Sequence, residues 1–176
     1  MSEPVPEDPE HRDQRQQLVA LYDAALGDVY GYLVRRCGSV IVAEELTSET
    51  FLAAVARIRR QRVESLTVAW LIGIARHKLV DHWRRAEREQ RTLALTDTYV
   101  VEDRWDVTLD AIDAHETLAE LAPHHRSVLT LRYLDGMPVA TVAQHIRRTT
   151  GATEVLLVRA RRAFRTAHEA RRGTEA

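Results

Sequence analysis

The side chains with the clearest chemical use in this sequence are arginines toward its C-terminal end. Residues 147–172 contain eight arginines and two glutamates, which gives this segment a strong excess of positive charge. Guanidinium groups bind phosphate oxygens through paired, charge-assisted hydrogen bonds. A surface that gathers several of them is typical of nucleic-acid binding, and an ordinary solvated charged face is the alternative.

A helix is needed to place these arginines on one surface. Thr153, Leu157, Ala160 and Phe164 are spaced i, i+4, i+7 and i+11, which predicts one buried stripe of an α-helix. We expect this stripe to pack against a neighbour and to leave the other side for an anionic partner or water. On that other side we place Glu154, Val155, Val158, Arg159 and Arg162.

The residues before this helix predict a shorter helix and a tight turn. Asp135-Gly136 is a turn signal, and Pro138 suits the first position of a helix because that position needs no backbone N–H. Apolar residues then recur from Val139 to Ile146, and the Thr149 hydroxyl can cap the next helix. Short helix, turn and basic helix form a helix-turn-helix pattern. The local pattern leaves an ordinary helical hairpin open as the alternative.

The composition predicts an all-α protein. The 176 residues include seven glycines and five prolines, too few for a disordered or fibrous chain, and no long strand-like alternation occurs. No apolar run approaches the length of a membrane span, and the acidic start does not resemble a signal peptide, so we expect a cytoplasmic protein without membrane insertion. The one cysteine, Cys37, excludes an internal disulfide. The histidines lack ligand spacing, and we expect no metal and no cofactor.

Charge is unevenly distributed although the net charge is −1. Residues 69–91 contain six basic and three acidic side chains, and residues 93–120 contain eight acidic side chains and one arginine. Two basic blocks joined by an acidic one suggest two separate nucleic-acid contacts. The acidic connector would either avoid the nucleic acid or imitate it.

The first basic block belongs to a helix that follows two others. The pattern of Leu18 to Leu33 predicts a helix ending near Gly38, and residues 42–60 and the segment from Val68 onward predict two more. Trp70 and Trp83 lie among the basic residues of the third helix. Indole rings in such a place can stack on unpaired bases, and burial in the core is the alternative for both.

Four stretches in this order carry a resemblance to a known family: "AEELTSETFLAAV", "AWLIGIARHKLVDHWRR", "LAELAPHHRSVLTLRYLDGMPVATVAQHI" and "ATEVLLVRARRAFR". Over roughly residues 15–170 the chain resembles the extracytoplasmic-function (ECF, group 4) sigma factors of bacterial RNA polymerase, in the sigma-70 family. The resemblance implies two small helical domains, a sigma region 2 bundle and a sigma region 4 helix-turn-helix, joined by a flexible acidic linker. The implied limits are 1–13 for a disordered acidic N-terminus, 14–92 for region 2, 93–110 for the linker, 111–170 for region 4 and 171–176 for a tail.

The resemblance also implies a function. Such a protein directs core RNA polymerase to promoters by recognising minus-10 and minus-35 elements, and it promotes transcription initiation without being an enzyme. Its partners would be core polymerase, through the beta-prime clamp helices and the beta flap, promoter DNA and an anti-sigma factor. The acidic connector resembles the linker that family members thread through the active-site cleft and RNA exit channel.

Two other classes of protein fit the sequence less well. A stand-alone helix-turn-helix transcriptional regulator is the alternative, and the two separated basic blocks argue against it. An enzyme is disfavoured because the sequence has no phosphate-binding loop, no metal-ligand set and no pair of nucleophile and base.

The family's functional residues can be placed on matching positions of this chain. For the core polymerase contact these are Glu45, Ser48, Phe51 and Leu52, with Ser48 where the family usually has Gln. The loop 61–67 stands where family members capture a flipped minus-10 base. The minus-10 residues are Arg62, Ser65, Trp70, Arg76, His77, Lys78, Asp81, Arg84 and Arg85. The minus-35 residues are Arg148, Thr149, Thr150, Glu154, Val155, Val158, Arg159 and Arg162.

Two positions depart from the family pattern. Glu154 stands where Lys or Arg is common, and a glutamate could accept a hydrogen bond from a cytosine amino group while Val155 and Leu156 meet thymine methyls. A protein-binding patch of Val155, Leu156 and Val158 is the alternative. Arg147 stands where the family commonly has a helix-ending glycine, and a left-handed backbone there would cost about 1 kcal/mol.

Overall fold

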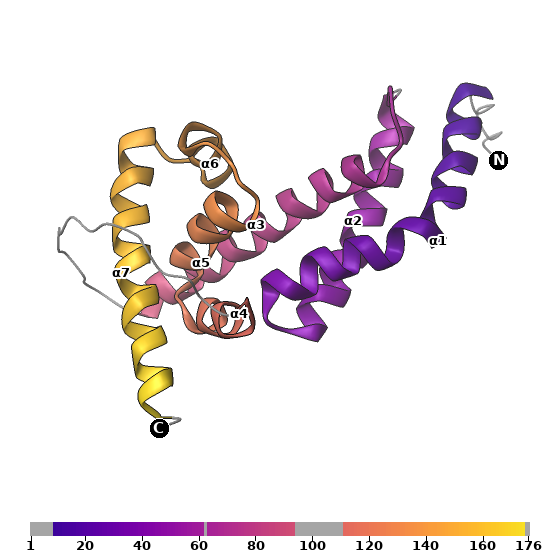
Figure 1. The fold of residues 1–176 in the computed structure, drawn as a ribbon. Helices are drawn as coiled ribbons and strands as arrows, with labels where there is room; N and C mark the ends of the chain where they lie inside the picture. The colour runs from indigo at the N-terminus through magenta and orange to yellow at the C-terminus, as the bar shows by residue number, and fades with distance from the viewer. Residues whose placement is uncertain (1–8, 62, 94–110, 175–176) are drawn as a thin grey trace. The chain divides into compact units, whose positions relative to one another are not determined.

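The computed structural model describes residues 9–61, 63–93 and 111–174 (Figure 1). All regular structure in these ranges is helical, which confirms the predicted all-α class. No helix within them is both long and apolar enough to cross a membrane. The chain divides into two compact units, Met1–Leu79 and Val80–Ala176, and the boundary falls inside one helix. The helices are α1 (Pro9–Cys37), α2 (Val40–Arg60), α3 (Val68–Leu93), α4 (Ala111–Glu120), α5 (Pro123–Leu129), η1 (Thr130–Leu134), α6 (Val139–Ile146) and α7 (Thr150–Thr174).

Helices α1 and α2 of the first unit lie side by side (Figure 1). The predicted stripe of α1 is buried at Leu18, Ala25, Val29 and Leu33, whereas its fifth member, Tyr22, is 42% exposed. Helix α1 ends before Gly38, whose φ of +67° is a left-handed conformation that glycine adopts without strain. The hydroxyl of Ser39 then caps α2 by accepting a hydrogen bond from the backbone N–H of Val42 at 3.5 Å.

Helix α2 buries two threonines without leaving their hydroxyls unpaired. Thr47 donates to the carbonyl of Ala43 at 2.6 Å, and Thr50 donates to the carbonyl of Leu46 at 2.7 Å. These bonds one turn back satisfy the polar group inside the helix that carries it. The two side chains can therefore lie in the core beside Ala54 and Ile58.

Helix α3 begins at a threonine cap. The Thr67 hydroxyl accepts from the N–H of Trp70 at 3.2 Å, and the Thr67 carbonyl accepts from the N–H of Leu71 at 3.1 Å. Leu71, Ala75 and Leu79 are fully buried, as their spacing predicts. Trp83 is 2% exposed, so its ring belongs to the core.

In the second unit, α7 packs through the stripe that its spacing predicts. Thr153, Leu157, Ala160 and Phe164 are all buried, and α4, α5 and α6 contact this helix. Fully burying a leucine or phenylalanine stabilises a fold by about 1.5–3 kcal/mol, so this stripe is the main anchor of the basic helix.

Two arginines fasten α4 in this unit. Arg126 donates to the carbonyls of Leu118 at 2.8 Å and Leu121 at 3.3 Å, and it also contacts the carbonyl of Ala119. These bonds satisfy the carbonyls left free at the C-terminal end of α4. Arg171 of α7 pairs with Glu116 and Glu120 of α4, and so joins the last turns of α7 to α4.

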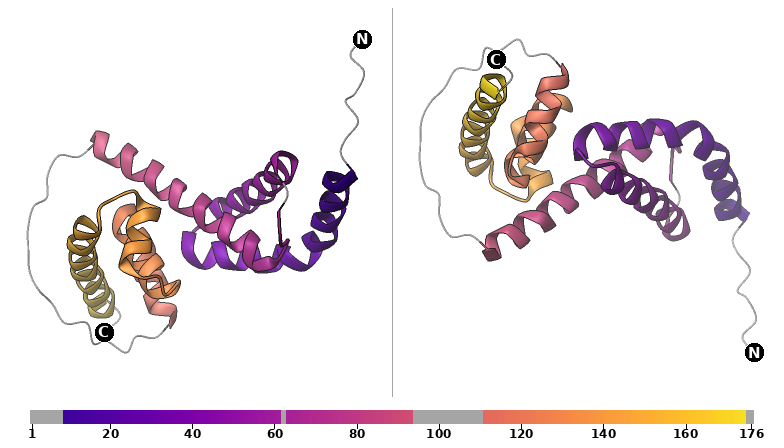
Figure 2. Two further views of the ribbon diagram at one scale, coloured as in Figure 1. Left: turned by 90° about the horizontal axis from the view of Figure 1, so that it is seen from above. Right: turned by 90° about the horizontal axis from the view of Figure 1, so that it is seen from below.

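The helix-turn-helix prediction is confirmed by α6 and α7, which a short turn joins (Figure 2). Pro138 is the residue just before α6 and not its first position. The Thr149 hydroxyl accepts from the N–H of Ala152 at 3.2 Å, as expected of a cap. Arg147 has φ 55° and ψ 50°, so it adopts the strained left-handed conformation expected where the family has glycine.

The chain before α6 contains a turn that the sequence did not predict. Residues Thr130–Leu134 form the π-helical turn η1, closed by a 3.0 Å bond from the N–H of Asp135 to the carbonyl of Thr130. Gly136 follows with φ +65°, which confirms the predicted turn. Arg132 donates to the carbonyl of Met137 at 2.8 Å and holds the loop toward α6.

The predicted ends of the two domains need correction. Helix α1 begins at Pro9, so residues 9–13 are helical although we assigned them to a disordered N-terminus. Helix α7 continues to Thr174 and takes in most of the predicted tail 171–176. The linker residues 94–110 lie outside the described residues, as do 1–8, 62 and 175–176.

Candidate functional site

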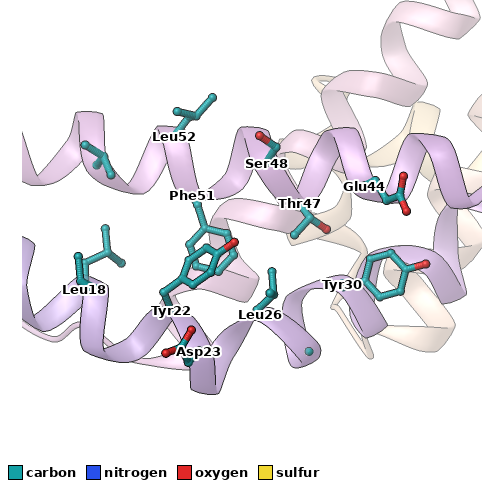
Figure 3. Close-up of a pocket in the computed structure, with 13 residues that line it drawn as sticks. Leu18, Tyr22, Asp23, Leu26, Tyr30, Glu44, Thr47, Ser48, Phe51 and Leu52 are labelled. Atoms are coloured by element: carbon teal, nitrogen blue, oxygen red, sulfur yellow. The ribbon is translucent and has the colours of Figure 1, made fainter.

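An apolar groove of about 830 Å³ lies between α1 and α2 in the first unit (Figure 3). Carboxylates stand at its edge, at Asp23 on α1 and Glu44 on α2. Its size and lining suit the side chains of a partner helix. Most of the lining is apolar: Leu18, Val19, Tyr22, Leu26, Phe51, Leu52 and Val55.

Three of the four predicted core-contact residues line this groove. They are Ser48, Phe51 and Leu52, and Leu52 is 67% exposed. Glu45 does not line the groove, whereas the adjacent Glu44 does. Successive helical residues point about 100° apart, so only one of two neighbouring glutamates can face the groove.

Phe51 is part of the fold as well as of the groove. Its side chain points from α2 toward α1, where the ring of Tyr22 lies beside it with centroids 4.7 Å apart (Figure 3). Phe51 is 8% exposed. Tyr22 was missed as a groove residue, as were Val19 and Leu26 of α1. Tyr22 belongs to the predicted buried stripe of α1, and Val19 and Leu26 are apolar side chains beside that stripe.

The loop from Gln61 to Thr67 is anchored by a residue that sequence reasoning missed. Gln14 of α1 donates to the carbonyl of Val63 at 2.7 Å and accepts from the N–H of Val63 at 3.3 Å. Ser65, a predicted minus-10 residue, is exposed in this loop, and Arg62 lies outside the described residues. No local pattern connects two residues 49 positions apart.

The predicted minus-10 residues of α3 differ in how exposed they are. His77, Asp81 and Arg85 are exposed at intervals of four residues and share one face, while Trp70 and Arg76 are half-buried. The ammonium group of Lys78 pairs with Glu49 at 3.1 Å, and Arg84 pairs with Asp81 at 3.0 Å. The charges of Lys78 and Arg84 are therefore offset by carboxylates.

The structure decides the open question about Trp83. Because this side chain is 2% exposed, it is not available to stack on a base. Trp70, which is half-buried, keeps part of its ring at the surface.

The exposed face of α7 carries most of the predicted minus-35 residues. Thr150, Glu154, Val155 and Arg162 are exposed, and Val158 lies half-buried between them. Thr149 is exposed too, but its hydroxyl is engaged in capping α7. This face lies opposite the buried stripe, so its side chains can meet a partner without disturbing the core.

The other predicted minus-35 residues lie partly inside. Arg148 and Arg159 are half-buried, and the Nε atom of Arg159 is buried without a hydrogen-bond partner. Leu156 is 6% exposed, so both predicted roles of this residue are wrong: the contact with thymine methyls and the patch with Val155 and Val158.

The charge of Arg159 contributes to a lowered pKa at His125, a residue of α5. The pKa of His125 is lowered from 6.5 to about 4, first by burial and then by the charges of His124 and Arg159. The rings of His124 and His125 lie with centroids 4.2 Å apart. His125 is therefore neutral near pH 7. Within the described ranges no group of three or more His, Cys, Asp or Glu side chains is placed to hold a metal ion.

Comparison with known proteins matches both units to one family. The model "Sigma-70 region 2" matches residues 21–89, and the model "Sigma-70, region 4" matches residues 112–164, together more than half of the chain. The chain belongs to the sigma-70 family. Gln14 precedes the part that the region 2 model matches.

Named relatives place the chain among the ECF sigma factors of this family. It is 35% identical over 147 residues to the ECF RNA polymerase sigma factor BldN of Streptomyces coelicolor, with 80% of this chain and 56% of BldN covered. It is 34% identical over 137 residues to the ECF RNA polymerase sigma factor SigF of Caulobacter vibrioides, with 76% and 75% covered. The chain thus spans a little over half of the first relative's length.

A solved structure shares the fold. The sigma factor RpoE of Bartonella quintana, solved in complex with the anti-sigma factor NepR, matches with a TM-score of 0.52 and 20% identity. The match covers 90% of this chain and 98% of that one.

Proposed function

We propose that this ECF sigma factor binds core RNA polymerase through the groove between α1 and α2 and reads promoter DNA with two separate surfaces. The observation that carries the proposal is the order of the parts: an apolar groove and a basic helix in a region 2 match, followed by a helix-turn-helix in a region 4 match. The chain would act by binding alone and perform no covalent chemistry.

The groove is proposed as the seat of the beta-prime clamp helices. Leu52, exposed on α2, and Phe51 below it offer apolar surface to a partner helix, and Glu44 and Asp23 offer charge at the edge. Exposed apolar side chains of this size favour a protein partner because contact removes them from water. Ser48 is short for a position that usually holds Gln, which leaves the centre of the contact mainly apolar.

The minus-10 surface is proposed to combine the loop 61–67 with the exposed face of α3. Ser65 stands at the loop and His77 and Arg85 stand on α3, where they can contact an opened strand. The carboxylate partners of Lys78 and Arg84 reduce the charge that these two offer to phosphate. Selectivity would therefore come more from the loop than from general attraction to DNA.

The minus-35 surface is proposed to be the exposed face of α7, placed in the major groove. Glu154 can accept from a cytosine amino group, and the methyl groups of Val155 and Val158 can meet thymine methyls. Arg162, two turns further along, is placed for a phosphate. The beta flap is proposed as the polymerase contact of this region.

The remaining predictions stay proposals drawn from the family. The linker 93–110 would thread through the active-site cleft, where its like charge repels RNA and transcript growth displaces it. An anti-sigma factor would hold the protein inactive. Because core polymerase works in the bacterial cytoplasm, we propose the same location for this chain.

Reconstitution with core RNA polymerase, followed by genome-wide run-off transcription, tests the proposed function. We expect a discrete set of start sites that share two upstream elements. A chain that fails to associate with core polymerase, or that adds no start sites to those of core alone, would contradict it. A stand-alone regulator would instead bind duplex DNA tightly without polymerase.

A further inference from the structure

The side-chain amide of Gln14 bonds both backbone groups of Val63, as a residue on a neighbouring β-strand would. Its side-chain amide donates to the Val63 carbonyl at 2.7 Å and accepts from the Val63 N–H at 3.3 Å, so both backbone groups of one loop residue are satisfied by one side chain. Gln14 is 9% exposed and therefore shielded from water, which would compete for these bonds. The loop runs beside the N-terminal part of α1 (Figures 1 and 2).

The loop is anchored on both sides of its exposed tip. On one side Gln14 holds Val63, and on the other the hydroxyl and carbonyl of Thr67 begin α3. Between the two anchors Glu64 and Ser65 are exposed. The backbone of this tip therefore has little freedom to move relative to α1 and α3.

We propose that Gln14 is a positioning residue for minus-10 recognition, which fixes the loop tip in the conformation that receives a base. The inference rests on the proposed function, because it assigns a cause to the selectivity of the same surface. Gln14 does not contact DNA in this account. It acts through the backbone of Val63.

The physical reason is the entropy of the loop. Fixing one residue's backbone costs about 1–2 kcal/mol, and about 1.4 kcal/mol corresponds to a tenfold change in affinity. When Gln14 fixes the loop during folding, binding of the correct base does not have to supply that cost. Without Gln14 the binding of the correct base must also order the loop, and this cost lowers its affinity. A wrong base that leaves the loop unordered does not meet this cost, so the difference in affinity between the two bases becomes smaller.

The test uses three variants of the full chain, each assembled on core RNA polymerase. Gln14→Met keeps the length of the side chain and removes both bonds, and Gln14→Glu keeps an acceptor for the Val63 N–H but cannot donate to the carbonyl. The matched control is Gln17→Met, because Gln17 lies one turn further along α1 and bonds only to the exposed Asp13, at 2.8 Å. Each assembly selects from single-stranded oligonucleotides with a randomised central segment, and the bound fraction is sequenced.

We expect Gln14→Met to lower the preference for the selected base by about tenfold at one position and to leave the other positions unchanged. Gln14→Glu should fall between wild type and Gln14→Met, and Gln17→Met should match wild type. Hydrogen exchange at the Val63 amide should quicken in Gln14→Met, and thermal melting reports whether the unit remains folded.

Two results would overturn the inference. One is an unchanged preference in Gln14→Met while the Val63 amide exchanges faster, and the other is an equal loss at every position together with a lower melting temperature. The latter result would mean that Gln14 stabilises the fold and does not position the loop for recognition of a base. If wild type itself selects no sequence, the proposed function fails, and that failure is distinct from a failure of Gln14.

Discussion

The two units relate their proposed binding surfaces to the buried core in opposite ways. In the first unit the groove residue Phe51 is also part of the core, 8% exposed and in contact with Tyr22. In the second unit α7 separates the two tasks, with Thr153, Leu157 and Phe164 buried on one side and Glu154 and Arg162 exposed on the other. Substitutions in the groove of the first unit should therefore change stability and binding together, whereas substitutions on the outer face of α7 should change binding alone.

The largest expected effect tests the coupling in the first unit. Phe51→Ala should lower the free energy of unfolding by about 3–5 kcal/mol, because it removes a buried ring, and it should also weaken core polymerase binding. Leu52→Ala is the matched variant, because this residue is 67% exposed and its loss should weaken binding with little effect on melting. Chemical denaturation and an affinity measurement with core polymerase check both. If the folded Leu52→Ala variant binds core polymerase with wild-type affinity, the groove is not the polymerase contact.

A second experiment compares two arginines of α7. Arg162→Ala should weaken binding of a minus-35 duplex about tenfold and reduce the salt slope by about one, with unchanged melting, because Arg162 is exposed. Arg159→Ala should weaken binding and also change stability, because Arg159 is half-buried and lies close enough to His125 to affect its charge. Titrations at several salt concentrations are the measurement. An unchanged slope in Arg162→Ala would place that residue off the DNA.

His125, which lies near Arg159 of α7, should make the free energy of unfolding depend on pH. The pKa of His125 is lowered to about 4 in the fold, so the unfolded chain binds more protons between about pH 4 and 6.5. Stability from this group is therefore fully present above about pH 6.5 and is lost as the pH falls toward 4. Because His125 is partly exposed, we expect a loss on the order of 1–2 kcal/mol.

Denaturation of His125→Gln across this pH range checks the prediction. The variant should lose less stability than wild type on acidification, and His124→Gln should fall between them because it removes one of the causes of the shift. Equal pH dependence in wild type and His125→Gln would show that other groups are responsible.

The smallest expected effect concerns the turn between α6 and α7. Arg147→Gly should stabilise the second unit by about 1 kcal/mol, because glycine adopts the left-handed conformation without strain. Arg147→Ala is the control, since it removes the charge and keeps the strain. Thermal melting distinguishes them, and equal melting temperatures for glycine and alanine would mean that strain contributes nothing there.

The parts of the fold that were predictable are those with a local cause. The buried stripe of α7 follows from residue spacing, and the cap at Thr149 follows from a hydroxyl beside free amides. Each depends on residues within a few positions of one another, so the sequence itself contains the pattern.

The parts that were not predictable depend on distant or one-residue effects. Gln14 meets Val63 only once α1 and α2 have packed, and no periodic pattern in the sequence indicates this contact. Glu44 lines the groove in place of the predicted Glu45, which is the neighbouring residue. The helical pattern of the sequence does not distinguish between these two positions. Leu156 was expected on the exposed face of α7 and is buried, and the burial of Trp83 was one of two alternatives that the sequence left open. Roles in binding polymerase or DNA remain predictions for every residue in these surfaces.

The contact of Arg171 with Glu116 and Glu120 decides where this protein can be cut. A fragment that stopped at residue 170 would keep every residue matched to region 4 yet lose the cation that holds α4 against α7. Two carboxylates would then face each other without a counter-charge. An excised region 4 should therefore retain about two more turns of α7, through Arg171, than the family match alone suggests.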